Sequence, residues 1–316
     1  KDLFILKKKL CPIILIVVLC ISMFSGCILD EMNESAELTA SINSGSSAAP
    51  VKTFAPDEDV STKPGLAGEL TVSFIDVGQG DSAFIELPNG KTMLIDAGVS
   101  DAGDKITKFI QKKGYQRIDY LIATHPHADH IGGMKKVIKN LDIGEIYMPK
   151  ASTNTRTYEK LLEEISERGL KIKTAKAGVS ICDGIEILAP NSTNYEDLNN
   201  YSVVLRLLNG ENSFLFMGDA EILSENEILN AGFDVSADVI KVGHHGSGTS
   251  SGNEFVNAVQ AKYAVFSVGD DNNYNHPHIF VVEKWKKAGA QICRTDEMGT
   301  VIFNSDGTNI EMISEK

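Results

Sequence analysis

Apolar residues recur from about residue 69 to the end of the chain in short runs separated by turn residues, as in a globular domain of strands and helices. Between two of these runs, the pair Asn209-Gly210 indicates a hairpin turn. Helical spacing covers 157–168 and the segment that holds Ile106 and Ile110 and ends at Gly114. The runs that predict strands are 70–76, 82–87, 92–95, 118–123, 203–208, 213–217, 239–242, 264–268, 300–303 and 310–313. Helices and strands alternate, so we expect an α/β (α+β) fold with much antiparallel pairing.

The first 26 residues have a different pattern. Lys7, Lys8 and Lys9 precede a mostly apolar, uncharged run, and small residues then stand before Cys27, which is typical of a secretory signal peptide. The end of this segment resembles a bacterial lipobox, in which Cys27 would become the lipidated first residue. Alternatively, the 20 uncharged residues 10–29 stay as a membrane-spanning anchor. Both interpretations place the remainder outside the cytoplasm, membrane-anchored or secreted.

Residues 27–68 are rich in serine, alanine, threonine, proline and acidic residues without sustained periodicity. This composition predicts a flexible tether, which leaves 69–316 as one domain. That domain holds two cysteines, Cys182 and Cys293. An extracytoplasmic location would permit a disulfide between them, and the sequence leaves their pairing open.

The charge of the chain bears on its ligands. The formal net charge is −13, and residues 1–26 hold four lysines and one aspartate, so the remainder carries −16. Such a field argues against broad neutralisation of nucleic-acid phosphates. Several cations are expected near the rim of the site described next and could serve a short stretch of nucleic acid, or they are simply solvated helix faces. They are Lys135, Lys136, Lys139, Lys150 and Arg156.

All seven histidines fall in three clusters, at 125–130, 244–245 and 276–278. His125, Asp219 and His244 each come directly after a predicted strand, so we expect these side chains to meet at one edge of a sheet. Between His125 and His130, three imidazoles and one carboxylate lie within six residues and cannot satisfy one another by hydrogen bonds alone. Nitrogen and oxygen donors of this kind suit Zn²⁺ and neighbouring first-row metals.

The stretch THPHADHIGG at 124–133 resembles the HxHxDH signature of the metallo-β-lactamase superfamily. Further segments are similar, in the same order, to the extracellular hydrolase domain of the ComEC-like DNA-uptake competence proteins. They are DVGQGD at 76–81, LIDAG at 94–98, NNYSVVLRL at 199–207, LFMGD at 215–219, KVGHHGS at 241–247 and NHP at 275–277. The resemblance implies a four-layer αβ/βα sandwich, here as a free-standing lipoprotein.

The resemblance also implies two divalent metal ions, Zn²⁺ or Mn²⁺. Carried over position by position, His125 and His127 bind the first metal, Asp129, His130 and His244 bind the second, and Asp219 bridges both. His244 is favoured over His245 because it is the first residue after the strand and its glycine. The superfamily normally supplies a third histidine to the first metal, and here that loop reads Asn-Asn-Tyr-Ser at 199–202. These are poorer ligands than imidazole, which makes Mn²⁺ credible beside Zn²⁺.

The implied reaction is attack of a hydroxide, held between the metals, on phosphorus or an acyl carbon. Asp129 and Asp219 would take part as metal ligands. His276 would contact the phosphate or protonate the leaving oxygen, or it is a solvent-facing loop histidine. Further candidates for substrate contacts are His245, Ser247 and Asn275.

Three functions follow from this resemblance. The first is a metal-dependent phosphodiesterase or nuclease, with DNA as one substrate. The second is a small-substrate esterase such as a phosphocholine esterase, and the third is a non-catalytic metal-binding surface lipoprotein. True β-lactamase activity is disfavoured, because those enzymes have cysteine where Asp219 stands or keep the missing histidine. The expected partners are the substrate and the membrane, and no protein partner is inferred.

Overall fold

The computed structural model describes residues 65–316. The leader expected at 1–26, its Cys27 boundary, and all but the last four residues of the expected tether lie outside the described residues. Within 65–316, no helix is both long enough and apolar enough to cross a membrane. Leu66 is buried and forms a parallel bridge with Asn209, so the packed region begins slightly before residue 69.

The first of two mixed sheets has eight strands in the order β15-β14-β1-β2-β3-β4-β5-β6. Its β1–β3 and β14–β15 pairings are antiparallel, whereas β3 to β6 run parallel. The strands are β1 (Leu70–Phe74), β2 (Ala83–Glu86), β3 (Thr92–Ile95), β4 (Arg117–Ile122), β5 (Asp142–Met148), β6 (Ile172–Thr174), β14 (Val301–Ser305) and β15 (Ile310–Ser314).

The second sheet has seven strands in the order β13-β12-β11-β10-β9-β8-β7. Asn209 ends β9 and Gly210 has a φ of 58°, which confirms the hairpin expected at this pair. The strands are β7 (Ser180–Cys182), β8 (Ile185–Ala189), β9 (Val204–Asn209), β10 (Asn212–Phe216), β11 (Val239–Lys241), β12 (Tyr263–Phe266) and β13 (Gln291–Arg294). Cys182 and Cys293 are both free.

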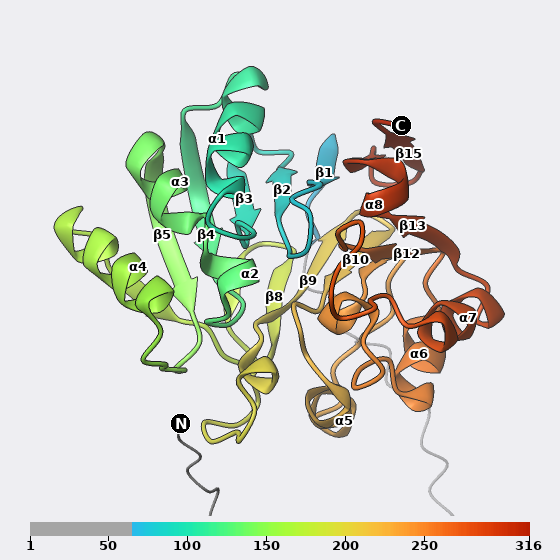
Figure 1. Ribbon diagram of the computed structural model, residues 1–316. Coiled ribbons are helices and arrows are strands. Elements are labelled where there is room, and N and C mark those ends of the chain that lie inside the picture. The colour runs from blue at the N-terminus through green and yellow to red at the C-terminus, as the bar shows by residue number, and fades with distance from the viewer. Residues whose placement is uncertain (1–64) are drawn as a thin grey trace, which may run out of the picture. The chain divides into compact units, whose positions relative to one another are not determined.

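Helices cover the outer face of each sheet (Figure 1). The first sheet packs against α1 (Ala102–Lys112), α3 (Met134–Asn140) and α4 (Arg156–Glu167), and the second against α5 (Ile222–Asn230), α6 (Asn253–Val259) and α7 (Ile279–Lys287). The short elements are α2 (Ala128–Ile131), α8 (Thr295–Met298) and the 3-10 turns η1 (Leu198–Tyr201) and η2 (Gly243–Gly246). The expected four-layer αβ/βα sandwich is confirmed.

The alternation of side chains along the strands builds three apolar layers. In β10, Phe214 and Phe216 enter the core between the sheets, while Leu215 points to the helices on the other face. Phe74 of β1 meets Phe216 across that core with ring centroids 5.8 Å apart. Contacts of this kind fix the two sheets against each other.

Truncation of a central core side chain tests this packing. Phe214 is fully buried, so we expect Phe214→Ala to lower the free energy of unfolding by about 3–5 kcal/mol. In a domain of this size that loss lowers the melting temperature by roughly 10 °C. Calorimetry measures it, with Ile313→Ala as the control because Ile313 is 45% exposed. Equal melting temperatures for the two variants would contradict this packing.

Glu225 of α5 ties the loop after η2 to the helical layer. Its carboxylate accepts hydrogen bonds from the backbone N–H groups of Ser251 and Gly252, at 2.6 and 2.7 Å. Burial raises the pKa of Glu225 to about 7, although these two donors lower it. The folded chain therefore holds this proton at pH values where the unfolded chain, with the ordinary pKa of 4.5, has released it.

This raised pKa predicts a loss of stability with rising pH. The contribution of Glu225 is fully present below pH 4.5 and is lost as the pH rises through about 7. Glu225→Gln does not titrate, so the unfolding free energy of the unaltered protein should fall relative to this variant by roughly 2–3 kcal/mol across that range. Urea unfolding at a series of pH values measures the difference. The exposed Glu254→Gln should keep the unaltered profile, and a Glu225→Gln profile of the same shape would refute the argument.

Candidate metal centre

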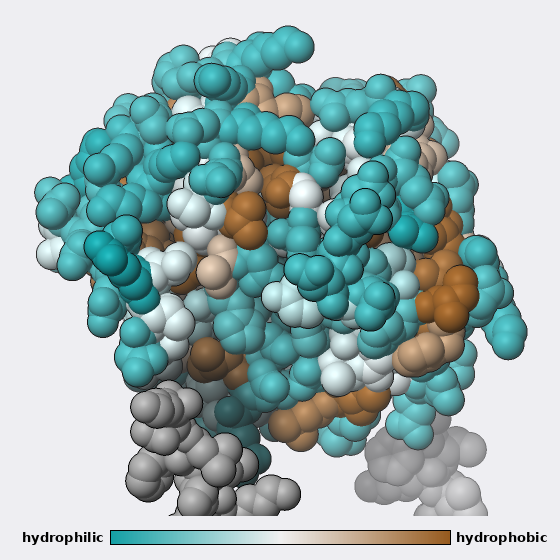
Figure 2. All heavy atoms as spheres, in the orientation of Figure 1, coloured by the Kyte–Doolittle hydropathy of each residue, from teal (hydrophilic) through white to brown (hydrophobic). Residues whose placement is uncertain are grey.

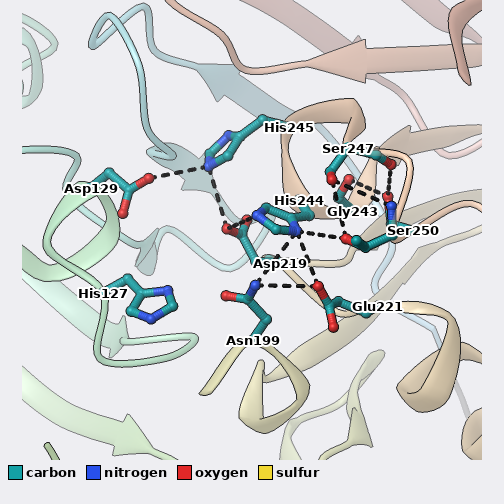
Figure 3. A network of polar contacts seen from close by, with 12 residues as sticks. His127, Asp129, Asn199, Asp219, Glu221, Gly243, His244, His245, Ser247 and Ser250 are labelled. Carbon is teal, nitrogen blue, oxygen red and sulfur yellow. Dashed lines mark hydrogen bonds and ion pairs between the residues drawn. The ribbon is translucent and has the colours of Figure 1, made fainter. Parts of the chain in front are cut away.

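The ends of strands from both sheets converge on one cavity. His125 follows β4 of the first sheet, while Asp219 and His244 follow β10 and β11 of the second. Of the predicted residues, His127, Asp129, Asp219, His244, His245 and His276 line a cavity of about 410 Å³. His125 and His130 lie behind its wall and are buried. The structure thus brings together all the predicted metal ligands, and Figure 3 shows several of them facing a common space.

Four side chains form the tightest group. One ligand atom from each of Asp129, His130, Asp219 and His245 lies within 4.8 Å of the others. The Nε2 atoms of His130 and His245 are 3.3 Å apart. His130 Nε2 is 3.2 Å from Asp219 Oδ1, and His245 Nε2 is 3.5 Å from a carboxylate oxygen of both Asp129 and Asp219. Two imidazoles and two carboxylates facing one point are a typical ligand set for a divalent metal.

Outer partners orient the two imidazoles of this group. His130 Nδ1 lies 2.7 Å from Asp96 Oδ2, and His245 Nδ1 lies 2.8 Å from the carbonyl oxygen of Ser267. With Nδ1 carrying the proton in each ring, the lone pair of Nε2 points into the group. Such histidine partners are the usual arrangement behind a metal ligand.

The charges within the group are strongly coupled. Burial disfavours a charged His130, but Asp219 and Asp96 outweigh burial and raise the pKa of His130 well above its usual value. In the same way, burial disfavours the charged form of His245, but Asp219 and Asp81 favour it. The pKa of His245 therefore rises to about 9. Without a metal, protons therefore compensate the buried carboxylates, and a bound cation would displace them.

His125 and His127 form a second group beside Asp219. His125 Nε2 is 3.0 Å from His127 Nδ1 and 3.8 Å from Asp219 Oδ2. His125 Nδ1 is within 3.3 Å of the hydroxyls of Thr124 and Ser202. These two histidines are where the resemblance places ligands of the first metal.

His244 also approaches Asp219. Its Nε2 is 3.8 Å from Asp219 Oδ2, while its Nδ1 is 3.0 Å from Thr249 Oγ1 and 3.4 Å from Glu221 Oε1. Asn199 lies beside it, with Nδ2 3.5 Å from Nδ1. Figure 3 shows His244 between Asp219 and Glu221, and His245 toward Asp129. The two adjacent histidines thus both approach Asp219 Oδ2, but His245 lies beside Asp129 and His244 beside Glu221.

The backbone of η2 explains this separation. His244 and His245 have φ values of 48° and 53°, in the left-handed region that residues with a Cβ seldom adopt. Two consecutive left-handed residues turn the chain sharply, and the imidazole planes differ by 63°. The expectation that His244 joins Asp129 and His130 is therefore corrected, because His245 takes that place. Strain of this type is common where side chains must be aimed at a site.

Two of the expected substrate contacts are not on the cavity wall. The hydroxyl of Ser247 accepts hydrogen bonds from the backbone N–H and hydroxyl of Thr249, so it shapes the turn. Asn275 is exposed, and its backbone lies in the left-handed region with a φ of 57°. His276 does reach the cavity, with its ring 5.5 Å from that of His244. Its Nδ1 is buried and has no hydrogen-bond partner among the described residues.

Sequence reasoning missed the residues behind the ligands. Asp81, at the end of the DVGQGD segment, forms an ion pair with buried Lys241, with Oδ2 2.7 Å from Nζ. Its Oδ1 lies 3.2 Å from His245 Nδ1. Gly80 has a φ of 139°, and a Cβ there would lie 2.3 Å from the carbonyl oxygen of Asp129. The DVGQGD motif drew attention to this segment but did not indicate what Gly80 and Asp81 do. The one signal in the sequence was that this motif accompanies the histidine motifs, which suggests a role in holding the ligands in place.

Asp219 provides the test of whether these residues fit a metal. It is 2% exposed, and its Oδ1 makes no hydrogen bond within the described part of the chain. A buried carboxylate needs a compensating positive charge, which protonated His130 and His245 supply in the chain alone. Cations between Asp219 and these imidazoles would satisfy both, so the residues fit a divalent-metal centre.

Comparisons with known proteins agree with this chemistry. Residues 75–270 match the model of the family described as Metallo-beta-lactamase superfamily. The chain is 34% identical over 260 residues to ComE operon protein 3 of Bacillus subtilis, covering 76% of this chain and 34% of that protein. It is 32% identical over 239 residues to Competence protein ComA of Neisseria gonorrhoeae, covering 74% and 32%. The chain thus spans about a third of the length of these relatives.

Among solved structures, CmlA, a diiron β-hydroxylase from Streptomyces venezuelae, is similar with a TM-score of 0.50 and 16% identity, covering 72% of this chain and 53% of that chain. At this identity the likeness shows the fold alone. The family match goes further, because residues 75–270 include every candidate metal ligand from His125 to His245. The chain therefore belongs to the metallo-β-lactamase superfamily of metal-dependent hydrolases, and it is homologous to the ComEC-like competence proteins.

Proposed function

We propose that this chain is a two-metal phosphodiesterase of the nuclease type that acts outside the cytoplasmic membrane. The observation that carries the proposal is the convergence of four imidazoles on Asp219. The Nε2 atoms of these histidines lie 3.2 to 3.8 Å from its two oxygens, and they are His125, His130, His244 and His245. A buried carboxylate with four imidazole nitrogens this close would suit a site that holds two cations.

The ligand sets follow from the grouping of Asp129, His130 and His245 around one point and from the pairing of His125 with His127. Asp129, His130 and His245 would hold one metal, and His125, His127 and His244 the other. In this assignment His244 supplies the nitrogen that the Asn-Asn-Tyr-Ser loop at 199–202 lacks. The Glu221 carboxylate and Thr249 hydroxyl beside His244 Nδ1 would keep its Nε2 directed at the metal. Zn²⁺ and Mn²⁺ both accept such nitrogen and carboxylate donors.

Bound metals would supply activation of water and stabilisation of the charge that develops on a phosphoryl group. The chain's own contribution at the mouth of the cavity is His276. Burial, together with His245 and His244, lowers the pKa of His276 to about 4, so the ring is neutral at pH 7. A neutral His276 on the cavity wall would hydrogen-bond a phosphoryl or leaving oxygen. It would therefore position that oxygen and would not supply a stored proton.

The substrate class and location rest on further support. One relative is named a competence protein and another is named for the ComE operon, which favours a polynucleotide substrate. The basic, apolar and small-residue pattern that ends at Cys27 supports attachment to the membrane through a lipid or an uncleaved helix. A phosphocholine ester is the second candidate, because the cavity of about 410 Å³ suits a small molecule.

Hydrolysis of a small phosphodiester tests the reaction. With Mn²⁺ or Zn²⁺ we expect turnover of bis-p-nitrophenyl phosphate, and a loss of more than about 100-fold in kcat/KM in Asp129→Ala and in Asp219→Ala, because each removes a metal ligand. Release of nitrophenolate measures the rate. Asp183→Ala, at an exposed turn, is the matched control. Bound metal without turnover of any phosphodiester would overturn the proposal.

Metal counting tests the two ligand sets independently of turnover. We expect His244→Ala and His245→Ala each to reduce the bound metal from about two ions per chain to about one, because each histidine serves a different ion. Adding Asn199→His to His244→Ala should restore the missing ion, since it returns a histidine to the 199–202 loop. Elemental analysis after dialysis gives the count. Two bound ions in His244→Ala would show that His244 is not a ligand.

A further inference from the structure

A second hollow lies beside the metal centre and is lined by cations. It has a volume of about 370 Å³ and lies where the end of α2 meets α3 and the start of α4. Of its lining residues five are cationic and none is acidic. Three come from α3 and two from α4, and they are Lys135, Lys136, Lys139, Arg156 and Lys160. Figure 2 shows that the face over α3 and α4 is predominantly hydrophilic.

This basic hollow continues the wall of the metal cavity. Along α2, Ala128 and Asp129 line the cavity and Ile131 lines the hollow. Before α4, Thr155 lines the cavity, and the next residue, Arg156, lines the hollow. Consecutive Cα atoms are about 3.8 Å apart. The two depressions therefore lie next to each other along both segments, close enough for an extended strand to reach from one to the other.

The cations of the hollow are only partly neutralised. Lys136 pairs with Asp104 at 2.6 Å, and Lys135 and Lys139 share the single carboxylate of Glu164 at 3.8 and 3.6 Å. Glu164 also pairs with Arg168 at 3.3 Å. One carboxylate is thus divided among three cations, which leaves an excess of positive charge.

Arg156 and Lys160 carry the rest of that excess. Neither forms an ion pair with another residue of 65–316. On a chain of net charge −13, a concave surface with surplus cations is a local reversal of sign. A merely solvated helix face accounts for exposed lysines, but not for five cations around one depression beside a hydrolytic centre.

We propose that this hollow binds backbone phosphates of a polynucleotide strand whose neighbouring phosphodiester lies at the metal centre. The inference rests on the proposed phosphodiesterase function and adds a separate site that would hold the strand next to the metal centre. Arg156 would bind a phosphate through two N–H groups, and the lysines would act as point charges. A phosphocholine ester ends within the metal cavity and has no further phosphate to place in the hollow. The hollow therefore separates the two substrate classes.

The test compares a strand with a small ester in the full chain. In Arg156→Gln/Lys160→Gln we expect the KM for single-stranded DNA to rise about 10-fold at moderate salt, while kcat/KM for bis-p-nitrophenyl phosphate stays unchanged. The slope of log affinity against log salt should become shallower by about 0.7 for each phosphate that the variant no longer neutralises. Fluorescence anisotropy with a labelled phosphorothioate strand measures binding without turnover. Lys286→Gln/Lys287→Gln in α7 removes the same charge from the opposite helical layer and serves as the control.

Each outcome decides one of the two proposals. If the hollow variant and the α7 variant bind the strand equally and with the same salt slope, the hollow is not a phosphate site. If the unaltered protein hydrolyses bis-p-nitrophenyl phosphate but does not bind the strand, the inference fails and the phosphodiesterase proposal stands. If the unaltered protein hydrolyses no phosphodiester, the proposed function fails, and strand binding that depends on Arg156 and Lys160 would still support the hollow.

Discussion

The buried carboxylate of Asp219 is the constraint on which the site depends. Its Oδ1 has no hydrogen bond among the described residues, and four imidazole nitrogens surround the group at 3.2 to 3.8 Å. An ionised group in this position has to be compensated by charge, because burial removes its hydration. In the chain alone, protonated histidines supply that charge, as the raised pKa values of His130 and His245 indicate. A divalent ion supplies it more effectively, so the same residues that hold protons in the chain alone create affinity for metal.

Because the donors come from different sheets, the packing between the sheets sets the geometry of the site. Phe74 of β1 against Phe216 at the end of β10 joins the first sheet to the second close to the ligand-bearing end of β10. The close contact of Gly80 with the backbone of Asp129 then fixes the position of α2 relative to the loop after β1. A site built on rigid strands and glycine contacts holds its ligands to within the small tolerance that coordination requires. The packing of the apolar core therefore sets the positions of the metal-ligand candidates.

The sequence predicted the strands that carry a strong local signal. Thr92–Ile95 and the hairpin at Asn209-Gly210 depend on neighbouring residues, and the structure confirms both. It did not predict β5, where Gly144 and Glu145 interrupt the apolar pattern and pairing with β4 and β6 decides the conformation. The choice between His244 and His245 likewise depends on backbone angles that no local pattern specifies. The motifs indicated which kinds of residue would bind metal, whereas long-range packing determined which histidine lies beside which carboxylate.

The acidic composition and the basic hollow act over different distances. At physiological ionic strength, charges are screened beyond about 8 Å, so the net charge of −13 affects the approach of a polyanion more than its bound state. At contact, the cations of α3 and α4 dominate, together with any metal charge at the centre. Added salt would therefore weaken repulsion during encounter and also weaken the contacts formed afterwards. An enzyme with this distribution would avoid general adhesion to nucleic acid, yet hold the strand segment that reaches its metal centre.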